Sequence, residues 1–160
     1  MARETDYFDD KLNIHIEGSN KDKRAALLKA TLWATHRLNL SKFNMDIDID
    51  VLSIPPRDGD FILGYASTID NNYRPRWFQI ELNRCLDLMD SLSVLFHEMT
   101  HVKQYIRGEL KIVERPAACT KWLGEEIEDD VIPYDDLPWE QEATEYQTIL
   151  LDEYLEIINR

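Results

Sequence analysis

Residues 93–105 read SVLFHEMTHVKQY and hold two of the four histidines of the chain. Apolar residues recur in it at spacings of three and four, which predicts an amphipathic helix. On such a helix, His97 and His101 lie one turn apart, on the side roughly opposite the apolar stripe. We therefore expect a helix, capped by Asp90 or Ser91 and ended by Gly108, with its apolar side on a core and its histidines in a cleft.

The spacing of these histidines suits a metal ion. Two imidazoles at positions i and i+4 can reach one ion, and Glu98 is turned about 100° from His97. The Glu98 carboxylate then lies beside the metal, where it can take a proton from water. Catalytic zinc needs a third protein ligand and leaves the fourth position to water.

A third ligand is available downstream, in residues 138–146 (PWEQEATEY). Pro138 precedes a run that is compatible with a helix to the end of the chain, and helices often begin in this way. Glu140, Glu142 and Glu145 lie in the first two turns of this expected helix. A carboxylate from it could complete a His-His-Glu site.

Three segments together resemble a known family. Residues 93–105, 121–124 (KWLG) and 138–143 (PWEQEA) are similar to the minimal gluzincins, small zincin-fold metallopeptidases and peptidase-like proteins of bacterial and phage genomes. The chain departs from the metzincins and the SprT-like proteases, because no histidine follows His101.

This resemblance implies a ligand set and an activity. The third ligand of such proteins is usually a Glu directly before a small residue, which corresponds to Glu142, with Glu140 as the alternative. One catalytic Zn²⁺ would then be held by His97, His101 and Glu142. The implied activity is zinc metalloendopeptidase: hydrolysis of peptide bonds through a zinc-activated water, with Glu98 as the general base. Candidates for stabilising the oxyanion or orienting the ligands are Tyr146, Tyr134, His36 and Glu145.

The strands follow from alternation. Residues 45–51 (MDIDIDV) alternate strictly and predict a strand with one wet face, and further strands are expected at 61–69 and 77–82. In zincins an edge strand just before the metal helix commonly pairs with an extended substrate. The resemblance therefore implies a substrate-binding edge strand containing Trp77, Phe78, Gln79 and Ile80.

The expected fold class is α+β and zincin-like. A small mixed or antiparallel sheet packs on the HExxH helix, with an N-terminal helix from Ser19 or Asn20 to about Asn39 and a C-terminal helix carrying the third ligand. A short hairpin is expected around residues 121–126. We expect one domain over residues 1–160, of which the first 18 or so form an extended arm.

Composition limits the functional classes. The chain has 160 residues, 44 % of them hydrophobic, which is ordinary for a globular domain. No apolar run is long enough to span a membrane, and the N-terminus has no apolar region of a signal peptide. Two cysteines far apart in sequence do not indicate a disulfide framework. These features predict a cytoplasmic protein.

The net charge is −13, and residues 125–136 hold seven Asp or Glu. This segment is expected to be a solvated loop, to select basic peptides or a basic protein partner, or to mimic the charge of nucleic acid. Direct nucleic-acid binding is not expected with 18 basic against 31 acidic residues. The alternative function is therefore a catalytically inactive zincin-fold regulator that uses its acidic surface to bind a partner.

Overall fold

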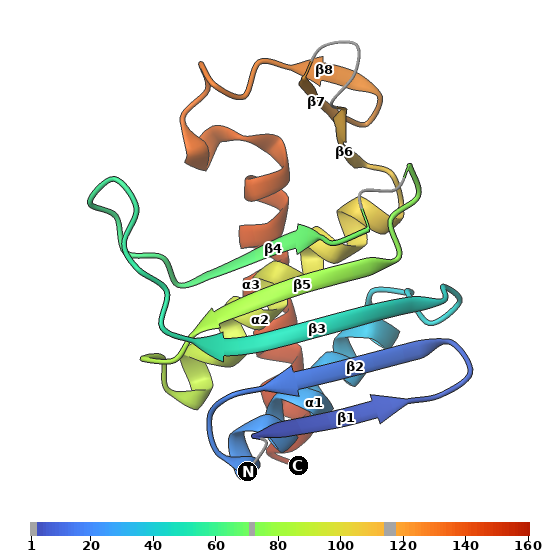
Figure 1. Ribbon diagram of the computed structural model, residues 1–160, viewed down its shortest axis with the longest axis vertical. Coiled ribbons are helices and arrows are strands. Elements are labelled where there is room, and N and C mark those ends of the chain that lie inside the picture. The colour runs from blue at the N-terminus through green and yellow to red at the C-terminus, as the bar shows by residue number, and fades with distance from the viewer. Residues whose placement is uncertain (1–2, 71–72, 114–117) are drawn as a thin grey trace.

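The computed structural model describes residues 3–70, 73–113 and 118–160, and they form a mixed α+β fold (Figure 1). The elements are β1 (Glu4–Phe8), β2 (Leu12–Glu17), α1 (Lys21–Arg37), β3 (Met45–Leu52), β4 (Gly64–Thr68), β5 (Trp77–Asn83), α2 (Leu88–Ile106), β6 (Leu110–Val113), β7 (Cys119–Trp122), β8 (Glu125–Ile127), the 3₁₀ turn η1 (Tyr134–Asp136) and α3 (Pro138–Ile158).

A five-stranded sheet in the order β1-β2-β3-β5-β4 forms one layer. β2, β3 and β5 run parallel, and the two outer strands run antiparallel to their neighbours. α1 and α2 pack on one face of this sheet, and α3 packs against α2. A smaller sheet, β6-β7-β8, stands at one end of the molecule. The mixed sheet expected from the sequence is confirmed.

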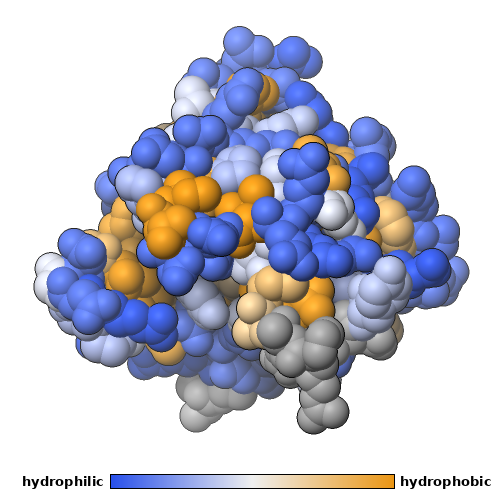
Figure 2. All heavy atoms as spheres, turned by 90° about the horizontal axis from the view of Figure 1, so that it is seen from above, coloured by the Kyte–Doolittle hydropathy of each residue, from blue (hydrophilic) through white to orange (hydrophobic). Residues whose placement is uncertain are grey.

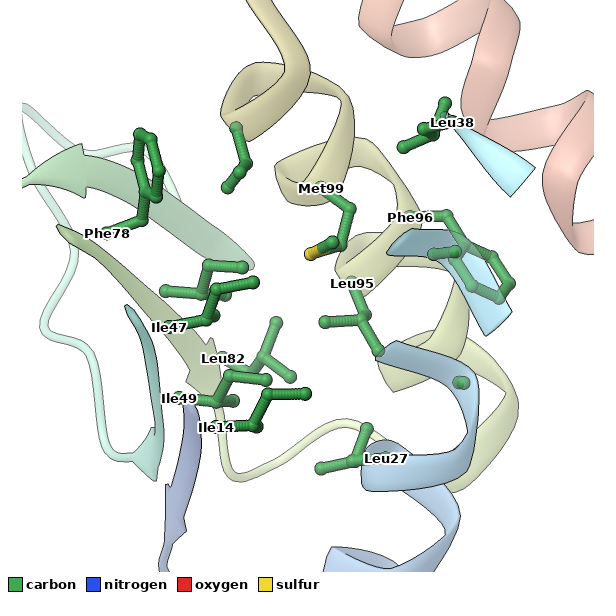
Figure 3. Close-up of a cluster of buried hydrophobic side chains, with 14 of the residues drawn as sticks. Ile14, Leu27, Leu38, Ile47, Ile49, Phe78, Leu82, Leu95, Phe96 and Met99 are labelled. Carbon is green, nitrogen blue, oxygen red and sulfur yellow. The ribbon is translucent and has the colours of Figure 1, made fainter. Parts of the chain in front are cut away.

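The core lies between the sheet and the helices (Figure 3). In β3 the residues Met45, Ile47, Ile49 and Val51 are buried, and the aspartates between them point to the other face, as alternation predicts. Leu95 and Met99 of α2 face this layer of strand side chains. The apolar side of α2 therefore packs on the sheet, and the side of α2 that carries the histidines is turned away from the sheet.

The helix ends follow local capping chemistry. Asn20 caps α1, with its side-chain oxygen accepting from the Lys23 amide at 2.8 Å. Asp87 caps α2 through the Asp90 amide, also at 2.8 Å, so the expectation of a cap at Asp90 or Ser91 is wrong by one turn. Gly108, with φ of +71°, follows the end of α2 as expected.

Two expectations about the sheet are wrong. Residues 77–80 do not form an edge strand, because β5 pairs with β3 on one side and β4 on the other. Its backbone groups are used inside the sheet, and Phe78 and Ile80 are core residues. The N-terminal segment is not an extended arm in its described part: β1 and β2 form a hairpin that joins the main sheet.

The hairpin expected around residues 121–126 is confirmed as β7 and β8. Leu123 and Gly124 connect them, both with positive φ, as a tight hairpin turn requires. In the described residues, none of the helices is long and apolar enough to cross a bilayer. Figure 2 views the end of the molecule that carries the small sheet, where hydrophobic side chains gather in patches on a largely hydrophilic surface.

The outer face of the main sheet is acidic. The register aligns Asp6, His15 and Asp48 across β1, β2 and β3, and the next row on this face consists of Glu4, Glu17, Asp50 and Glu81. The Asp and Glu residues of this chain are therefore concentrated on the open face of the main sheet as well as in residues 125–136.

His15 lies among the carboxylates of this acidic face. Its Nε2 lies 2.9 Å from Glu17, and its Nδ1 pairs with Asp6. Hydrogen bonds to Glu17 and Asp6 raise the pKa of His15 to about 9. A raised pKa means that the folded state binds this proton more tightly than the unfolded state does.

We therefore expect a pH-dependent contribution of His15 to stability. It is fully present below the ordinary histidine pKa near 6.5 and is lost as the pH rises through about 9. In urea unfolding, wild type should exceed His15→Gln in free energy of unfolding by about 1 kcal/mol or less at low pH, because solvent screens the pair. The difference should vanish above the folded pKa. His36→Gln, at an exposed helix end, is the control; an unchanged gap for His15→Gln across this range would contradict the assignment.

Candidate metal centre

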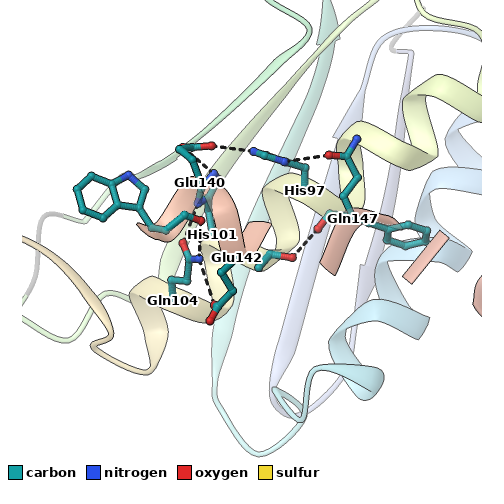
Figure 4. Close-up of polar contacts among 9 residues, drawn as sticks. His97, His101, Gln104, Glu140, Glu142 and Gln147 are labelled. Carbon is teal, nitrogen blue, oxygen red and sulfur yellow. Dashed lines mark hydrogen bonds and ion pairs between the residues drawn. The ribbon is translucent and has the colours of Figure 1, made fainter. Parts of the chain in front are cut away.

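Two helices bring three potential ligands together (Figure 4). His97 and His101 project from the middle of α2, one turn apart, and Glu140 projects from the first turn of α3. Pro138 opens α3, where its fixed φ suits the first helical position and no amide hydrogen is needed. The first turn of α3 therefore lies beside the polar side of α2.

The ligand atoms converge on one point. His97 Nε2 lies 3.0 Å from one Glu140 oxygen, and His101 Nε2 lies 3.1 Å from the other. The two imidazole centroids are 4.9 Å apart. Among the described residues, these three side chains form a group whose ligand atoms all lie within 4.8 Å of one another. Glu140 and His101 are buried, each 7 % exposed.

The geometry corrects the choice between the two glutamates. Glu140 lies at the histidines, whereas the Glu142 carboxylate accepts from Lys103 Nζ at 2.9 Å and from Gln104 Nε2 at 3.2 Å. Two residues along a helix are turned by about 200°, so only one of this pair can face the histidines. Glu140 is the candidate third ligand, and Glu142 belongs to the hydrogen-bond network around it.

Gln104 fixes the tautomer of His101. Its amide nitrogen donates to the Trp139 carbonyl at 2.9 Å and to Glu142, so its oxygen must face His101 Nδ1, 2.8 Å away. That nitrogen therefore carries a proton. In the neutral imidazole Nε2 then presents a lone pair toward Glu140, which is the state a metal ligand needs.

His97 has a matching partner. Its Nδ1 lies 3.1 Å from the Gln147 amide oxygen, and the Gln147 nitrogen donates to Ser93 at 2.7 Å. Each histidine is thus oriented by a glutamine, one from its own helix and one from α3. The sequence analysis gives no role to Gln104 or to Gln147. The available signal for Gln147 was its position seven residues after Glu140, on the same helical face.

Charge in the site follows from burial and pairing. Burial opposes ionisation of Glu140, but hydrogen bonds with His101 and His97 outweigh it and lower the pKa of Glu140 to about 2. For His101, burial works against the charged form, and the hydrogen bond to Glu140 still raises its pKa. A carboxylate between two imidazole nitrogens stabilises positive charge at this point, whether it is a proton or a metal ion.

Glu98 lies next to this group and is not one of the three converging residues. It is 5 % exposed, and burial raises its pKa. A side chain at Gly64 would meet Val94 Cγ1 at 2.5 Å and Glu98 Oε1 at 3.4 Å. Glycine at this position therefore lets β4 approach α2 closely beside Glu98. Among the described residues, β4 pairs only with β5, so β4 is the edge strand at the site.

The other predicted residues divide into two groups. Tyr134 is brought to the site: although the residue is 65 % exposed, its hydroxyl is partly desolvated near the Glu140 carboxylate, and both effects raise its pKa. Tyr146 packs at the core margin, and Lys103 Nζ lies 5.3 Å from its ring centroid. Glu145 is exposed on α3, and His36 is exposed in the last turn of α1. Neither of these two belongs to the converging group.

Comparisons of the chain with protein-family models, with curated proteins and with solved structures find no match. The function is therefore argued from the geometry of the site.

We expect Glu140→Gln and Glu142→Gln to differ in metal content. Both remove one carboxylate from the first turns of α3, but only Glu140 faces the histidines. Wild type and Glu142→Gln should hold about one zinc per chain after reconstitution, and Glu140→Gln far less, because zinc binds ionised carboxylate much better than a neutral amide. Emission spectrometry on protein dialysed against metal-free buffer measures this. Loss of zinc in Glu142→Gln with retention in Glu140→Gln would reverse the ligand assignment.

Gln104→Ala tests the orienting network. His101 would lose the acceptor that fixes its Nδ1 proton, and we expect a zinc affinity about 10- to 100-fold lower than wild type. Competition with a chromogenic chelator measures this change. Gln141→Ala, at an exposed position of α3, is the control and should leave the affinity unchanged. Equal affinities for the two variants would contradict the role of Gln104.

Proposed function

We propose that this protein is a zincin-like zinc metallopeptidase, with His97, His101 and Glu140 as the metal ligands. The observation that supports this most directly is the convergence of two histidine Nε2 atoms on a buried carboxylate, with Glu98 beside them. Two nitrogens and one oxygen from three side chains are the donor set of catalytic zinc in His-His-Glu peptidases.

The donor set argues against a structural zinc. Structural sites are closed by four protein ligands, usually including cysteines. Cys85 is exposed at the end of β5, and Cys119 lies in β7, where its sulfur contacts Glu126. Neither cysteine belongs to the converging group. Three protein ligands leave a coordination position for water or substrate, as catalysis requires.

Glu98 is the proposed general base. A bound zinc would acidify a water molecule and polarise the substrate carbonyl. Glu98 would take the proton from that water and deliver it to the leaving amine, which requires a carboxylate that both accepts and returns a proton near neutral pH. Its burial supports this role, because burial raises the pKa of a carboxyl group toward that range.

Tyr134 is the proposed oxyanion donor. The nearby Glu140 carboxylate contributes to the raised pKa of its hydroxyl, which keeps the phenol protonated and able to donate a hydrogen bond. Tyr134 is 65 % exposed, so substrate can reach it from solvent. Tyr134 would stabilise the negative charge that develops on the carbonyl oxygen as the tetrahedral intermediate forms.

β4 is the proposed substrate-binding strand. It passes next to Glu98 at Gly64, and its outer edge has no strand partner among the described residues. An extended peptide could pair with this edge and present its backbone carbonyl to the metal centre. Such binding would rely on main-chain hydrogen bonds, with side chains of the peptide supplying selectivity.

A second candidate is a catalytically inactive regulator of zincin-like fold. The acidic face of the main sheet favours it, since two rows of carboxylates on β1, β2, β3 and β5 offer a broad surface for a basic protein partner. This function needs neither Glu98 nor an accessible metal, which separates it from the peptidase.

Glu98→Gln tests the peptidase proposal. The variant should keep about one zinc and lose turnover by about 10²- to 10⁴-fold, the usual contribution of a general base. Turnover is measured on a fluorogenic peptide library with zinc-reconstituted protein. Glu145→Gln, exposed on α3, is the control and should match wild type.

Cleavage by Glu98→Gln at the wild-type rate would contradict the assignment of the base. A wild-type protein that binds zinc and cleaves no member of the library would instead favour the regulator.

A further inference from the structure

A cavity of about 460 Å³ lies outside the metal centre, where the end of α2, the start of β6 and the segment before β5 meet. Four cationic side chains line it: Arg74, Arg76, Arg107 and Lys111. Among the described residues, none of the four has a carboxylate within ion-pair distance. Asp70 is in contact with this group through the Arg76 backbone amide, which donates to its carboxylate at 2.9 Å. In a chain of net charge −13, four cations that form no ion pair with the described residues are unexpected.

Neutral groups hold these cations in place. Arg107 Nη2 donates to the Leu38 and Asn39 carbonyls at 3.2 and 3.1 Å, at the end of α1. The Arg76 guanidinium lies 5.1 Å from the Phe43 ring centroid and donates to the Pro75 carbonyl. Carbonyls and rings orient the cations without neutralising them, so their charge remains available to a ligand.

Aromatic side chains form the remaining walls. Lys111 Nζ lies 4.3 Å from the Tyr73 ring centroid, and Tyr105 contributes from the last turn of α2. The cavity thus combines positive charge with planar apolar surface.

We propose that this cavity binds the phosphate group of a small organic molecule. Guanidinium groups present paired donors that match phosphate oxygens, and several cations favour a dianion over a single charge. The volume is in the range of small-molecule sites and exceeds what one phosphate ion fills, so the aromatic walls are available to the organic part.

The charge distribution favours a small ligand over a nucleic acid. A polyanion that reached this cavity would extend over the surrounding surface of a strongly acidic protein and be repelled by it. The last-turn carbonyls of α2 disfavour an anion, and the four cations that line the cavity oppose this effect. A compact dianion gains the attraction of the four cations and avoids the long-range repulsion.

Isothermal titration calorimetry with adenosine monophosphate, inorganic phosphate and adenosine tests this proposal. The titrations are made at low salt and at a pH about one unit or more above the second phosphate pKa near 6, so that the phosphate is a dianion. Under these conditions the nucleotide should bind about tenfold tighter than adenosine. Nucleotide binding that is tighter than that of phosphate assigns an organic phosphate. Equal affinities retain phosphate recognition and assign the free ion.

Paired variants locate the site. Arg74→Gln/Lys111→Gln should weaken nucleotide binding about tenfold or more, because two charge-assisted contacts are lost. Arg57→Gln/Arg84→Gln removes the same charge from exposed positions outside the cavity and should leave binding unchanged. Circular dichroism and thermal unfolding establish that both double variants are folded.

Three results would overturn the proposal. These are equal affinity for adenosine and its monophosphate, no binding of either phosphate compound, or unchanged binding by Arg74→Gln/Lys111→Gln. His97→Ala separates this site from the proposed peptidase: binding should persist in it, and its loss would move the anion to the metal centre. The phosphate-binding proposal can therefore be contradicted without affecting the peptidase proposal, and the peptidase proposal can be contradicted without affecting phosphate binding.

Discussion

The burial of the polar side of α2 is the constraint on which the site depends. α2 is covered by the sheet on one side and by α3 on another, so His101 and Gln104 lie away from water. Buried polar groups cost free energy unless they are hydrogen-bonded. The first turns of α3 supply those partners through the Trp139 carbonyl, Glu140 and Glu142. The same contacts that make α3 pack on α2 also orient the imidazoles.

Charge is separated across the fold. Carboxylates occupy the open face of the main sheet, where alternation in β2 and β3 turns every second residue to solvent. Cations that form no ion pair with the described residues gather at the far end of α2, around the cavity that Arg76 and Lys111 line. The candidate metal centre lies at the middle of α2 and combines one carboxylate with two imidazoles. Each region therefore favours a different ligand chemistry.

Local sequence patterns predicted the structural features that are set by residues close together in the sequence. The alternation of residues 45–51 predicts β3, and the spacing of His97 and His101 predicts their shared face on α2. The choice between Glu140 and Glu142 depends on how α3 is rotated against α2, which no local spacing determines. The position of β5 inside the sheet depends on β4 returning beside it, and this is a long-range pairing. Gln147 became recognisable only once α3 was placed.

The assembly of the ligands from two helices has a thermodynamic consequence. The chain between His101 and Glu140 includes the small sheet, so an ion held by both residues would act as a cross-link that closes this long loop. Because the unfolded chain would release the ion, the stabilisation would follow mass action and be about 2.7 kcal/mol at a free metal concentration 100 times the dissociation constant. Metal supply would then determine how long the docked arrangement of α2 and α3 survives before it opens, and the lifetime of the fold would depend on the metal status of the cell.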